Sequence, residues 1–373
     1  SLRRLKGFKE LTAFINDASP QVMSDAVRAI YDDAEAQTFL VYPKSLSAVA
    51  GSLDPQHPPA VNVRAIAANR RLGTSSSAKR ISRFLANPSL SRALRIQALY
   101  ALESWPQASQ LDPIDGRYFP VPAGDMDALN EAIGPEIWAL ANDTDDKISR
   151  QAIAVLQRIN PDKAKLDQAA GFVLDEKQRS VVRKEWLRLL RKWDLTLFTS
   201  VGAQALTSQS PELRVVAAQE LTEAERGGTA VDSYLLATLK NSGDPVELQR
   251  AIKMIPRLTS RKYIIEQLVK ALIAGRIAPE IQLEVLETAT TISRDSTDLK
   301  TQLEHYNNYI NKQDIMTRYG VALKGGNVEK GNSIFFGHAQ AQCSKCHALK
   351  QIDKQVGPSL EGIAQRHSRE YLL

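Results

Sequence analysis

The feature that most constrains the fold is a short segment, an arginine followed by small and apolar residues, that recurs along the first 250 residues. Successive copies are separated by 36, 31, 55, 33, 31 and 36 residues, and residues 281–289 continue the series without the arginine. A period in the low to middle thirties indicates stacked helical repeats, in which each repeat buries its apolar face against its neighbours. The recurring arginines are Arg28, Arg64, Arg95, Arg150, Arg183, Arg214 and Arg250.

Within each repeat the apolar residues follow helical spacing. Leu94, Ala98, Leu99 and Leu102, for example, share one stripe of a helix, and such a stripe must be buried. Almost no stretch alternates as a strand would, and the signature residues of tetratricopeptide repeats are absent from the sequence. We therefore predict an all-α protein with a HEAT-like α-solenoid over residues 1–322. Its recurring arginines are expected either to bond the backbone or acids of an adjoining repeat or to face solvent.

One interval between copies is long because it contains a proline-rich insertion near residues 105–124, with Trp105 and Tyr118 as aromatic residues. Long loops in repeat proteins are commonly functional or form interaction surfaces. We expect the insertion either to pack against another domain or to be an ordered excursion on the surface.

A second feature lies near the end of the chain. Residues 343–347 read Cys-Ser-Lys-Cys-His, and Cys343 and Cys346 are the only cysteines. C-x-x-C-H is the attachment signature of a c-type haem. Two thiols on one helical turn can each add to a vinyl group of the same porphyrin, and His347 then lies under the ring as proximal iron ligand. The sequence thus predicts a haem c domain over residues 323–373.

The flanking residues fit this interpretation. Phe335 lies in a short apolar helical stretch before the motif, and Gly357-Pro358 begins ten residues after His347. We expect the carbonyl of Pro358 to accept the Nδ1 proton of His347, which would fix the orientation of the ring. Leu360 and Ile363 are expected to pack on the haem edge. Without the C-x-x-C-H motif, the Gly-Pro pair would indicate only a turn.

The cysteine pair has two other interpretations. A structural zinc site would need four ligands, and His347 combined with His338 or His367 has no familiar zinc spacing. A thioredoxin-like dithiol would follow a strand in a βαβ unit, and nothing around residue 343 reads as one. Haem is therefore preferred, with zinc kept as the alternative.

The distal iron ligand is not evident from the sequence. His367 is a candidate, although the start of a helix on the surface suits it better, and His338 is a weaker one. The chain ends within an amphipathic helix that begins near Ser368, so we expect a class I cytochrome c domain that is incomplete at its C-terminus. A distal Met would lie downstream of Cys343, and all four methionines lie upstream: Met23, Met126, Met254 and Met316.

Bulk properties narrow the range of partners. The net charge of +6 is too dispersed for a nucleic-acid-binding stripe, and no apolar run is long enough to span a bilayer. Because a c-type haem is attached outside the cytoplasm, we expect a signal peptide upstream of Ser1 and a periplasmic or otherwise exported location. Lys345, Lys350 and Lys354 flank the motif; they either steer an acidic redox partner or form a solvated face.

Two segments resemble one group of large exported proteins, the haem-binding C-x-x-C-H proteins of planctomycetes and verrucomicrobia. Residues 99–118, which contain Trp-Pro followed by Leu-Asp-Pro-Ile-Asp-Gly-Arg-Tyr, resemble a characteristic segment of that family, and residues 331–372 resemble its haem module. The family combines a propeller similar to soluble sugar dehydrogenases, HEAT-like repeats and a C-terminal cytochrome c domain. The resemblance implies thioether bonds at Cys343 and Cys346. It places any dehydrogenase activity in a propeller outside these residues.

The expected function is therefore electron transfer by a haem c on a helical-repeat scaffold, with a redox protein or a dehydrogenase domain as partner. The sequence shows no Ser/His/Asp set, phosphate loop or H-E-x-x-H motif, so no catalytic residue is assigned. The alternative is a protein-interaction scaffold with a structural zinc or a vestigial Cys/His site.

Overall fold

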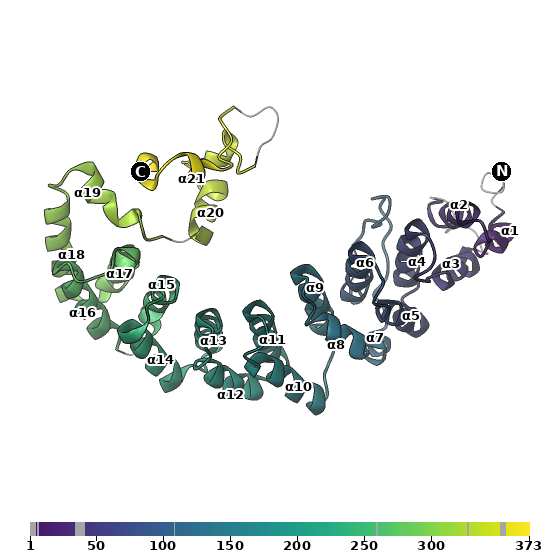
Figure 1. Cartoon of the computed structure of the whole chain (residues 1–373), viewed down its shortest axis with the longest axis horizontal. Helices are drawn as coiled ribbons and strands as arrows, with labels where there is room; N and C mark the ends of the chain where they lie inside the picture. Colours follow the sequence, from purple (N-terminus) through teal and green to yellow (C-terminus); the bar gives the residue numbers. More distant parts are fainter. Residues whose placement is uncertain are drawn as a thin grey trace. The chain divides into compact units, whose positions relative to one another are not determined.

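The computed structural model describes residues 5, 7–33, 42–107, 109–258, 260–326, 328–350 and 356–373. The chain divides into two compact units, Ser1–Ala205 and Leu206–Leu373 (Figure 1). The described residues of both units form helices and connections, with one isolated antiparallel bridge between Leu111 and Tyr118. Among these residues, no helix is long and apolar enough to cross a membrane.

The first unit contains twelve α-helices and one described 3-10 turn. They are α1 (Phe8–Leu11), η1 (Thr12–Phe14), α2 (Pro20–Tyr31), α3 (Tyr42–Gly51), α4 (Pro59–Leu72), α5 (Ser75–Leu85), α6 (Arg92–Glu103), α7 (Met126–Ala132), α8 (Pro135–Leu140), α9 (Asp146–Leu156), α10 (Lys163–Leu174), α11 (Ser180–Trp193) and α12 (Leu195–Ala205).

The second unit continues with helices of similar length and ends in several short ones. They are α13 (Pro211–Glu223), α14 (Gly228–Asn241), α15 (Pro245–Met254), η3 (Ile255–Arg257), α16 (Arg261–Ile273), α17 (Pro279–Ile292), η4 (Ser293–Asp295), α18 (Thr297–Ile310), α19 (Ile315–Tyr319), η5 (Gly320–Ala322), α20 (Val328–Gly337), η6 (Cys343–Lys345), α21 (Ile363–Arg366) and α22 (Arg369–Leu372).

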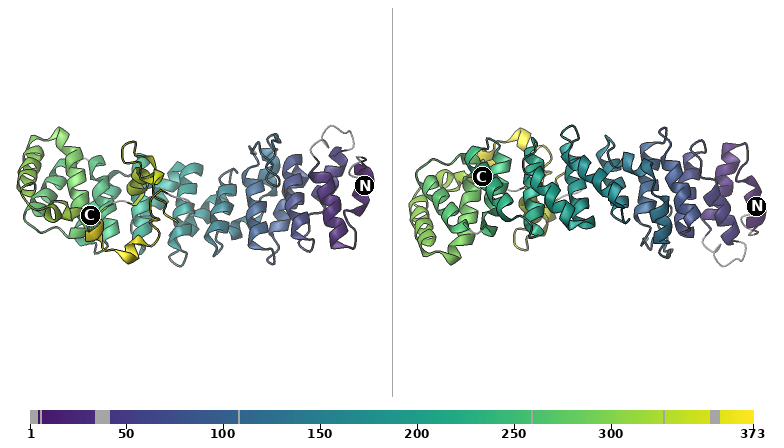
Figure 2. Two further views of the ribbon diagram at one scale, coloured as in Figure 1. Left: turned by 90° about the horizontal axis from the view of Figure 1, so that it is seen from above. Right: turned by 90° about the horizontal axis from the view of Figure 1, so that it is seen from below.

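Both units are α-solenoids, as the repeat period predicted. The helices that carry the recurring arginines pack on one another in a row, α2 on α4, α4 on α6, α6 on α9 and α9 on α11 in the first unit, and α13 on α15 in the second. The other helices pair with this row, as α3 does with α4, α10 with α11 and α14 with α15. Figure 2 shows these helices side by side along each unit. Each repeat thus buries its apolar stripe against its neighbours.

Local signals in the sequence set where the helices begin. Side-chain oxygens of Ser19, Ser91, Asp145, Ser210 and Asp244 accept hydrogen bonds from backbone N–H groups in the first turn of α2, α6, α9, α13 and α15. Such caps satisfy donors that a helix leaves unpaired at its N-terminus. Proline stands at the start of α2, α4, α13, α15 and α17, where its missing N–H costs no helical bond.

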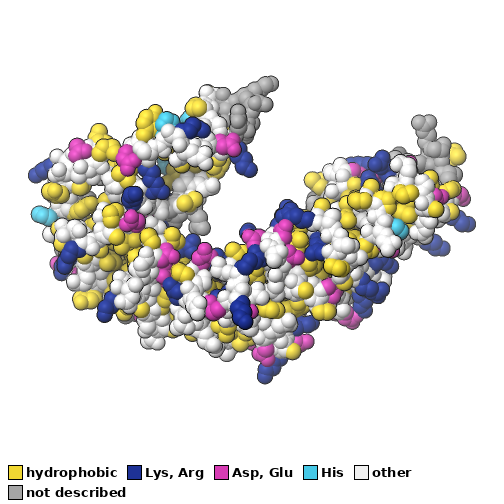
Figure 3. Space-filling model, viewed as in Figure 1, with side chains coloured by type: hydrophobic (Ala, Val, Ile, Leu, Met, Phe, Trp, Pro, Cys, Tyr) yellow, Lys and Arg dark blue, Asp and Glu magenta, His cyan; other side chains and the backbone are white. Residues whose placement is uncertain are grey.

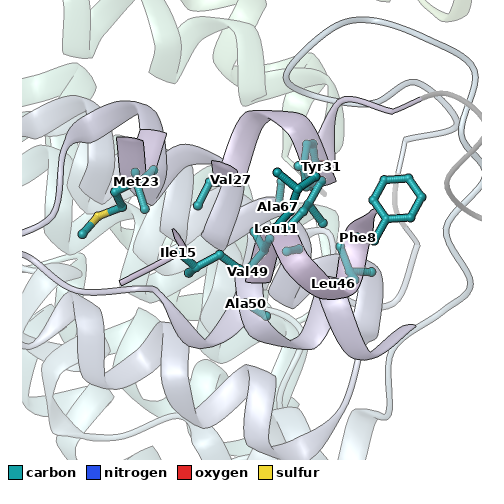
Figure 4. Close-up of a cluster of buried hydrophobic side chains, with 13 residues drawn as sticks. Phe8, Leu11, Ile15, Met23, Val27, Tyr31, Leu46, Val49, Ala50 and Ala67 are labelled. Carbon is teal, nitrogen blue, oxygen red and sulfur yellow. The ribbon is translucent and has the colours of Figure 1, made fainter. Parts of the chain in front are cut away.

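The core at the start of the first unit illustrates how the stripes interlock (Figure 4). Side chains from α1, α2, α3 and α4 meet there and exclude water, which is the main stabilising contribution to such a fold. The residues drawn and labelled include Phe8, Leu11, Ile15, Met23, Val27, Tyr31, Leu46, Val49, Ala50 and Ala67.

The recurring arginines follow both expectations. Arg64 forms a bidentate pair with Asp32 of the preceding repeat, with N–O distances of 2.9 and 2.8 Å. Arg214 does the same with Glu247 of the following repeat, at 2.7 Å for both contacts. Arg95 reaches Asp143 of the following repeat, and Arg183 reaches Glu176 of its own repeat. Arg28 and Arg150 are exposed, and Arg150 pairs with Asp146 one turn earlier on the same helix. On the face drawn in Figure 3, Lys and Arg are interspersed with Asp and Glu.

The insertion near residues 105–124 is an ordered hairpin on the first unit. Its two antiparallel segments are joined by hydrogen bonds from Asp112 N to Arg117 O (2.8 Å) and from Phe119 N to Gln110 O (2.7 Å). Trp105 is fully buried at its base, and its indole N–H donates to the carbonyl of Asp125 at 3.0 Å. The expected ordered excursion is present, packed onto the repeats of its own unit.

The boundary between the two units, after Ala205, lies within the helical repeats. The expected division into residues 1–322 and 323–373 follows from the extent of the repeats and from the haem motif. It stays a prediction.

Candidate functional site

The C-x-x-C-H motif lies on a single tight turn after α20. Gln342 adopts a left-handed conformation with φ 47°, and the 3-10 turn η6 begins at the next residue. Backbone N–H groups of Cys346 and His347 donate to the carbonyl of Cys343 at 3.2 and 2.9 Å. Both thiols are free; that of Cys343 is half-buried and that of Cys346 is exposed. The turn therefore presents both sulfurs and the imidazole within five residues.

His347 is held by the contact expected from the sequence. Its Nδ1 lies 2.9 Å from the carbonyl oxygen of Pro358. Because a carbonyl can only accept, Nδ1 must carry the proton, and Nε2 keeps its lone pair for a metal ion. Hydrogen bonds of this kind fix the tautomer and orientation of metal-binding histidines.

The loop that carries Pro358 is attached to the motif by backbone bonds on both sides of His347. Gly357 N donates to Cys346 O, and Leu360 N donates to Ala348 O, both at 2.8 Å. A Cβ at Gly357 would lie 2.8 Å from the Cys346 carbonyl and 2.9 Å from Cε1 of His347. Any larger residue would therefore displace the loop or the imidazole, which explains glycine at this position.

The apolar residues around the motif are only partly covered. Across the described parts of 328–373, Ala348 is the one buried side chain, whereas Phe335, Leu360 and Ile363 are half-buried. Phe335 packs edge-on against Phe336, with ring centroids 4.9 Å apart. Phe335, Leu360 and Ile363 are thus partly open to solvent. Lys345 and Lys350 beside it are exposed, and Lys354 lies outside the described residues.

The two histidines considered as distal ligands have other contacts. Nδ1 of His338 accepts hydrogen bonds from the backbone of Gln340 and Ala341 at 3.3 and 3.1 Å. The ring of His367 stacks on Tyr371 with centroids 4.2 Å apart, on the helix start where it was expected. Ser368 caps that helix, α22, as predicted.

Sequence reasoning missed the contacts that join this segment to α17. The carboxylate of Glu284, 1 % exposed, accepts a hydrogen bond from Gly326 N at 3.1 Å. Lys330 pairs with Glu287 of α17 at 2.8 Å. Within the C-terminal segment itself, Arg369 donates to the carbonyl of Leu323 at 2.6 Å. The Gly325–Gly326 pair was the signal in the sequence that could have indicated this close contact. A Cβ at Gly325 would lie 2.8 Å from Leu283 Cβ, so the approach to α17 requires glycine there.

Within the part of the chain that the structure describes, no three His, Cys, Asp or Glu residues cluster in a way that could hold a metal ion. This holds for Cys343, Cys346 and His347 as well, which are among the described residues.

Comparison with known proteins gives one match in sequence and several in fold. No family model matches the chain. Over 53 residues it is 42 % identical to a cytochrome c-553-like protein of Synechocystis, and the match covers 14 % of this chain and 45 % of that protein. A part of this chain is thus similar to a cytochrome c-553-like protein. The matched part spans less than half the length of that relative.

The similar solved structures include an engineered protein and a designed armadillo repeat protein. An engineered protein is 16 % identical with a TM-score of 0.35, covering 87 % of this chain and 88 % of that one. A designed armadillo repeat protein, solved with a peptide, is 12 % identical with a TM-score of 0.22, covering 79 % and 95 %. Likenesses this distant carry no argument about function.

Proposed function

We propose that the chain carries a covalently bound haem c and transfers electrons. In this proposal Cys343 and Cys346 are the thioether attachments and His347 is the proximal iron ligand. The observation that carries it is the imidazole of His347, with Nδ1 bonded to Pro358 O and the Nε2 lone pair left for iron. The partial similarity to a cytochrome c-553-like protein supports the same interpretation.

The residues present fit a haem. The fit is supported by Gly357, which brings the loop against the imidazole, and by Phe335, Leu360 and Ile363, which are half-buried. A flat apolar ring packed on these side chains would remove them from water. Attachment needs no oxidant, because each thiol adds across one vinyl group: sulfur bonds to one carbon and the thiol hydrogen ends on the other. When bound, the iron supplies a one-electron redox couple.

The wider context extends this proposal. A haem c implies maturation outside the cytoplasm, so the protein would be periplasmic or otherwise exported. Residues 1–322 would form the scaffold and 323–373 the haem domain of a larger protein of the planctomycete and verrucomicrobial type. The partner would be a redox protein or a dehydrogenase domain. The exposed Lys345 and Lys350 favour an acidic surface on that partner, since opposite charges speed encounter.

Haem staining and metal analysis test the proposal. The protein should be produced with a c-type maturation system in the periplasm and run on a denaturing gel. We expect haem that stays with the polypeptide, an absorption α band after reduction, and one iron per chain. The Cys343→Ala/Cys346→Ala double variant should lose the stain. Colourless wild-type protein with one zinc per chain would instead support the interaction scaffold with a structural zinc.

A further inference from the structure

An open cleft on the first unit combines apolar walls with buried charges that do not balance. It has a volume of about 300 Å³ and lies between α2, α4, α6 and the insertion hairpin. Ile66, Ala67 and Ala101 form part of its apolar wall, and the exposed side chains of Tyr100 and Leu111 also line it. The cleft is within the size range of small-molecule sites and is reached directly from solvent.

The charged side chains in the wall of this cleft are Arg70, Arg71 and Asp112. Asp112 Oδ2 accepts hydrogen bonds from Arg71 Nη2 at 2.7 Å and from Tyr31 OH at 2.6 Å. Its Oδ1 accepts from the backbone N–H of Ile114 at 2.8 Å. The one acid in the wall is therefore committed to Arg71 and to the hairpin that carries it.

Arg70 has no such acid. Its side chain is buried, and it donates only to the carbonyl oxygens of Ser104, Trp105 and Pro122, at distances of 2.9 to 3.2 Å. These bonds use four of the five guanidinium N–H groups, and the fifth, on Nη1, has no acceptor among the described residues. The carbonyls of Ser104 and Trp105 lie at the C-terminal end of α6, whose partial negative charge offsets only part of the cation.

The wall is therefore positively charged. Burial without a compensating carboxylate lowers the pKa of Arg70, but the group stays protonated at neutral pH because its ordinary pKa lies far above 7. Two arginines and one aspartate leave one net positive charge. Beside apolar walls, water screens this charge less completely than on an open surface. An anion in the cleft gains attraction that a neutral molecule does not.

From these features we infer that the cleft beside the insertion hairpin binds a small organic anion with one carboxylate and an apolar body. The apolar wall covers the body, and the net positive charge attracts the carboxylate. Gln97, half-buried in the same wall on α6, can donate a further hydrogen bond. This site is independent of the proposed haem function.

Equilibrium dialysis of the full-length protein at neutral pH tests the inference with three probes. Naphthoate has both features, naphthol has the same rings without the charge, and acetate has the carboxylate without an apolar body. We expect one saturable naphthoate site per chain. Naphthol should bind weaker by about tenfold or more, because it gains no charge attraction. Acetate should also bind weaker by about tenfold or more, because it buries little apolar surface.

Changing the charge of the wall gives the second test. Gln97→Glu cancels the net positive charge at a position that solvent reaches, so it should weaken naphthoate by about tenfold or more and naphthol by less than about twofold. Gln168→Glu, exposed on α10 and outside the cleft, makes the same change in total charge and should alter neither.

Arg70→Gln should also weaken naphthoate by about tenfold or more, since it removes the cation that has no acid. If this variant fails to fold, Gln97→Glu and the three probes decide. Absence of saturable naphthoate binding, equal affinity for naphthol or for acetate, an unchanged naphthoate affinity in Gln97→Glu, or an equal loss in Gln168→Glu would overturn the inference.

Discussion

At the scale of single residues, Gly357 controls how the proximal histidine is held. Gly357→Ala would push a methyl group into the Cys346 carbonyl and the imidazole. We expect a loss of about 1–3 kcal/mol in the unfolding free energy of the holoprotein, as for other overpacked sites. Denaturant titration followed by haem absorbance measures it. Gly331→Ala is the control, because a Cβ there meets nothing within 4 Å; equal effects of the two variants would contradict the assignment.

The second prediction at the residue scale concerns Glu247 and the dependence of stability on pH. Burial alone would raise the pKa of this carboxyl, but hydrogen bonds from Arg214, Ser242 and Tyr234 outweigh burial and lower it. A lowered folded-state pKa gives stability that is complete above the unfolded value of 4.5 and is lost as pH falls through the folded value.

Urea unfolding at a series of pH values tests this. The unfolding free energy of the wild type should fall as pH drops below 4.5, and Glu247→Gln should show a shallower fall. At neutral pH the variant should be less stable by about 2–3 kcal/mol. This is no more than the smallest loss expected for a broken buried ion pair, because Arg214 is partly exposed and water can solvate its charge. Identical pH slopes would exclude the role given to Glu247.

At the scale of elements, Asp112 holds the insertion hairpin on α2 and α4. Asp112→Ala would leave Arg71 buried without its carboxylate and should cost about 3 kcal/mol. Hydrogen exchange should show faster exchange at the amides of Asp112 and Phe119 while α9 and α11 stay protected. Asp115→Ala, which removes a more exposed ion pair with Arg117, should have a small effect.

Glu284 is the corresponding anchor between α17 and the C-terminal segment. Glu284→Ala removes the acceptor of Gly326 N and the ion-pair partner of Lys253, and should cost about 1.5–3 kcal/mol, the range for a hydrogen bond to a charged group. Thermal unfolding followed by haem absorbance checks it. Glu287→Ala breaks only the exposed pair with Lys330 and should change little. A larger loss of stability in Glu287→Ala than in Glu284→Ala would contradict the assignment of the anchor to Glu284.

What the sequence predicted at this scale depended on periodicity. Helical spacing and arginine intervals identified the repeats, and the helix expected near Ser368 begins there. The motif and Gly357-Pro358 predicted the bond at His347. The contacts of Arg70, Arg71 and Glu284 were not predicted, because each joins residues more than 30 positions apart that follow no repeat. Arg183, whose side chain is buried, pairs with Glu176 of its own repeat, so the period likewise does not show which recurring arginine is buried.

At the scale of the whole molecule, the two compact units predict unfolding that is not two-state. All four tryptophans, Trp105, Trp138, Trp186 and Trp193, lie in the first unit, and the proposed haem lies in the second. Guanidinium titration followed by tryptophan fluorescence and by haem absorbance should therefore give different midpoints. Coincident midpoints would mean that the repeats unfold as one cooperative array.

The insertion hairpin also bears on the order in which the first unit folds. Its bond from Tyr31 to Asp112 joins residues 81 positions apart, while the stacking of α2 on α4 and of α4 on α6 uses shorter separations. Closing a long loop costs entropy that local contacts must first offset. The hairpin is thus expected to dock late, after the helices beneath it have assembled. In the folding sequence it would then stabilise a surface that has already formed.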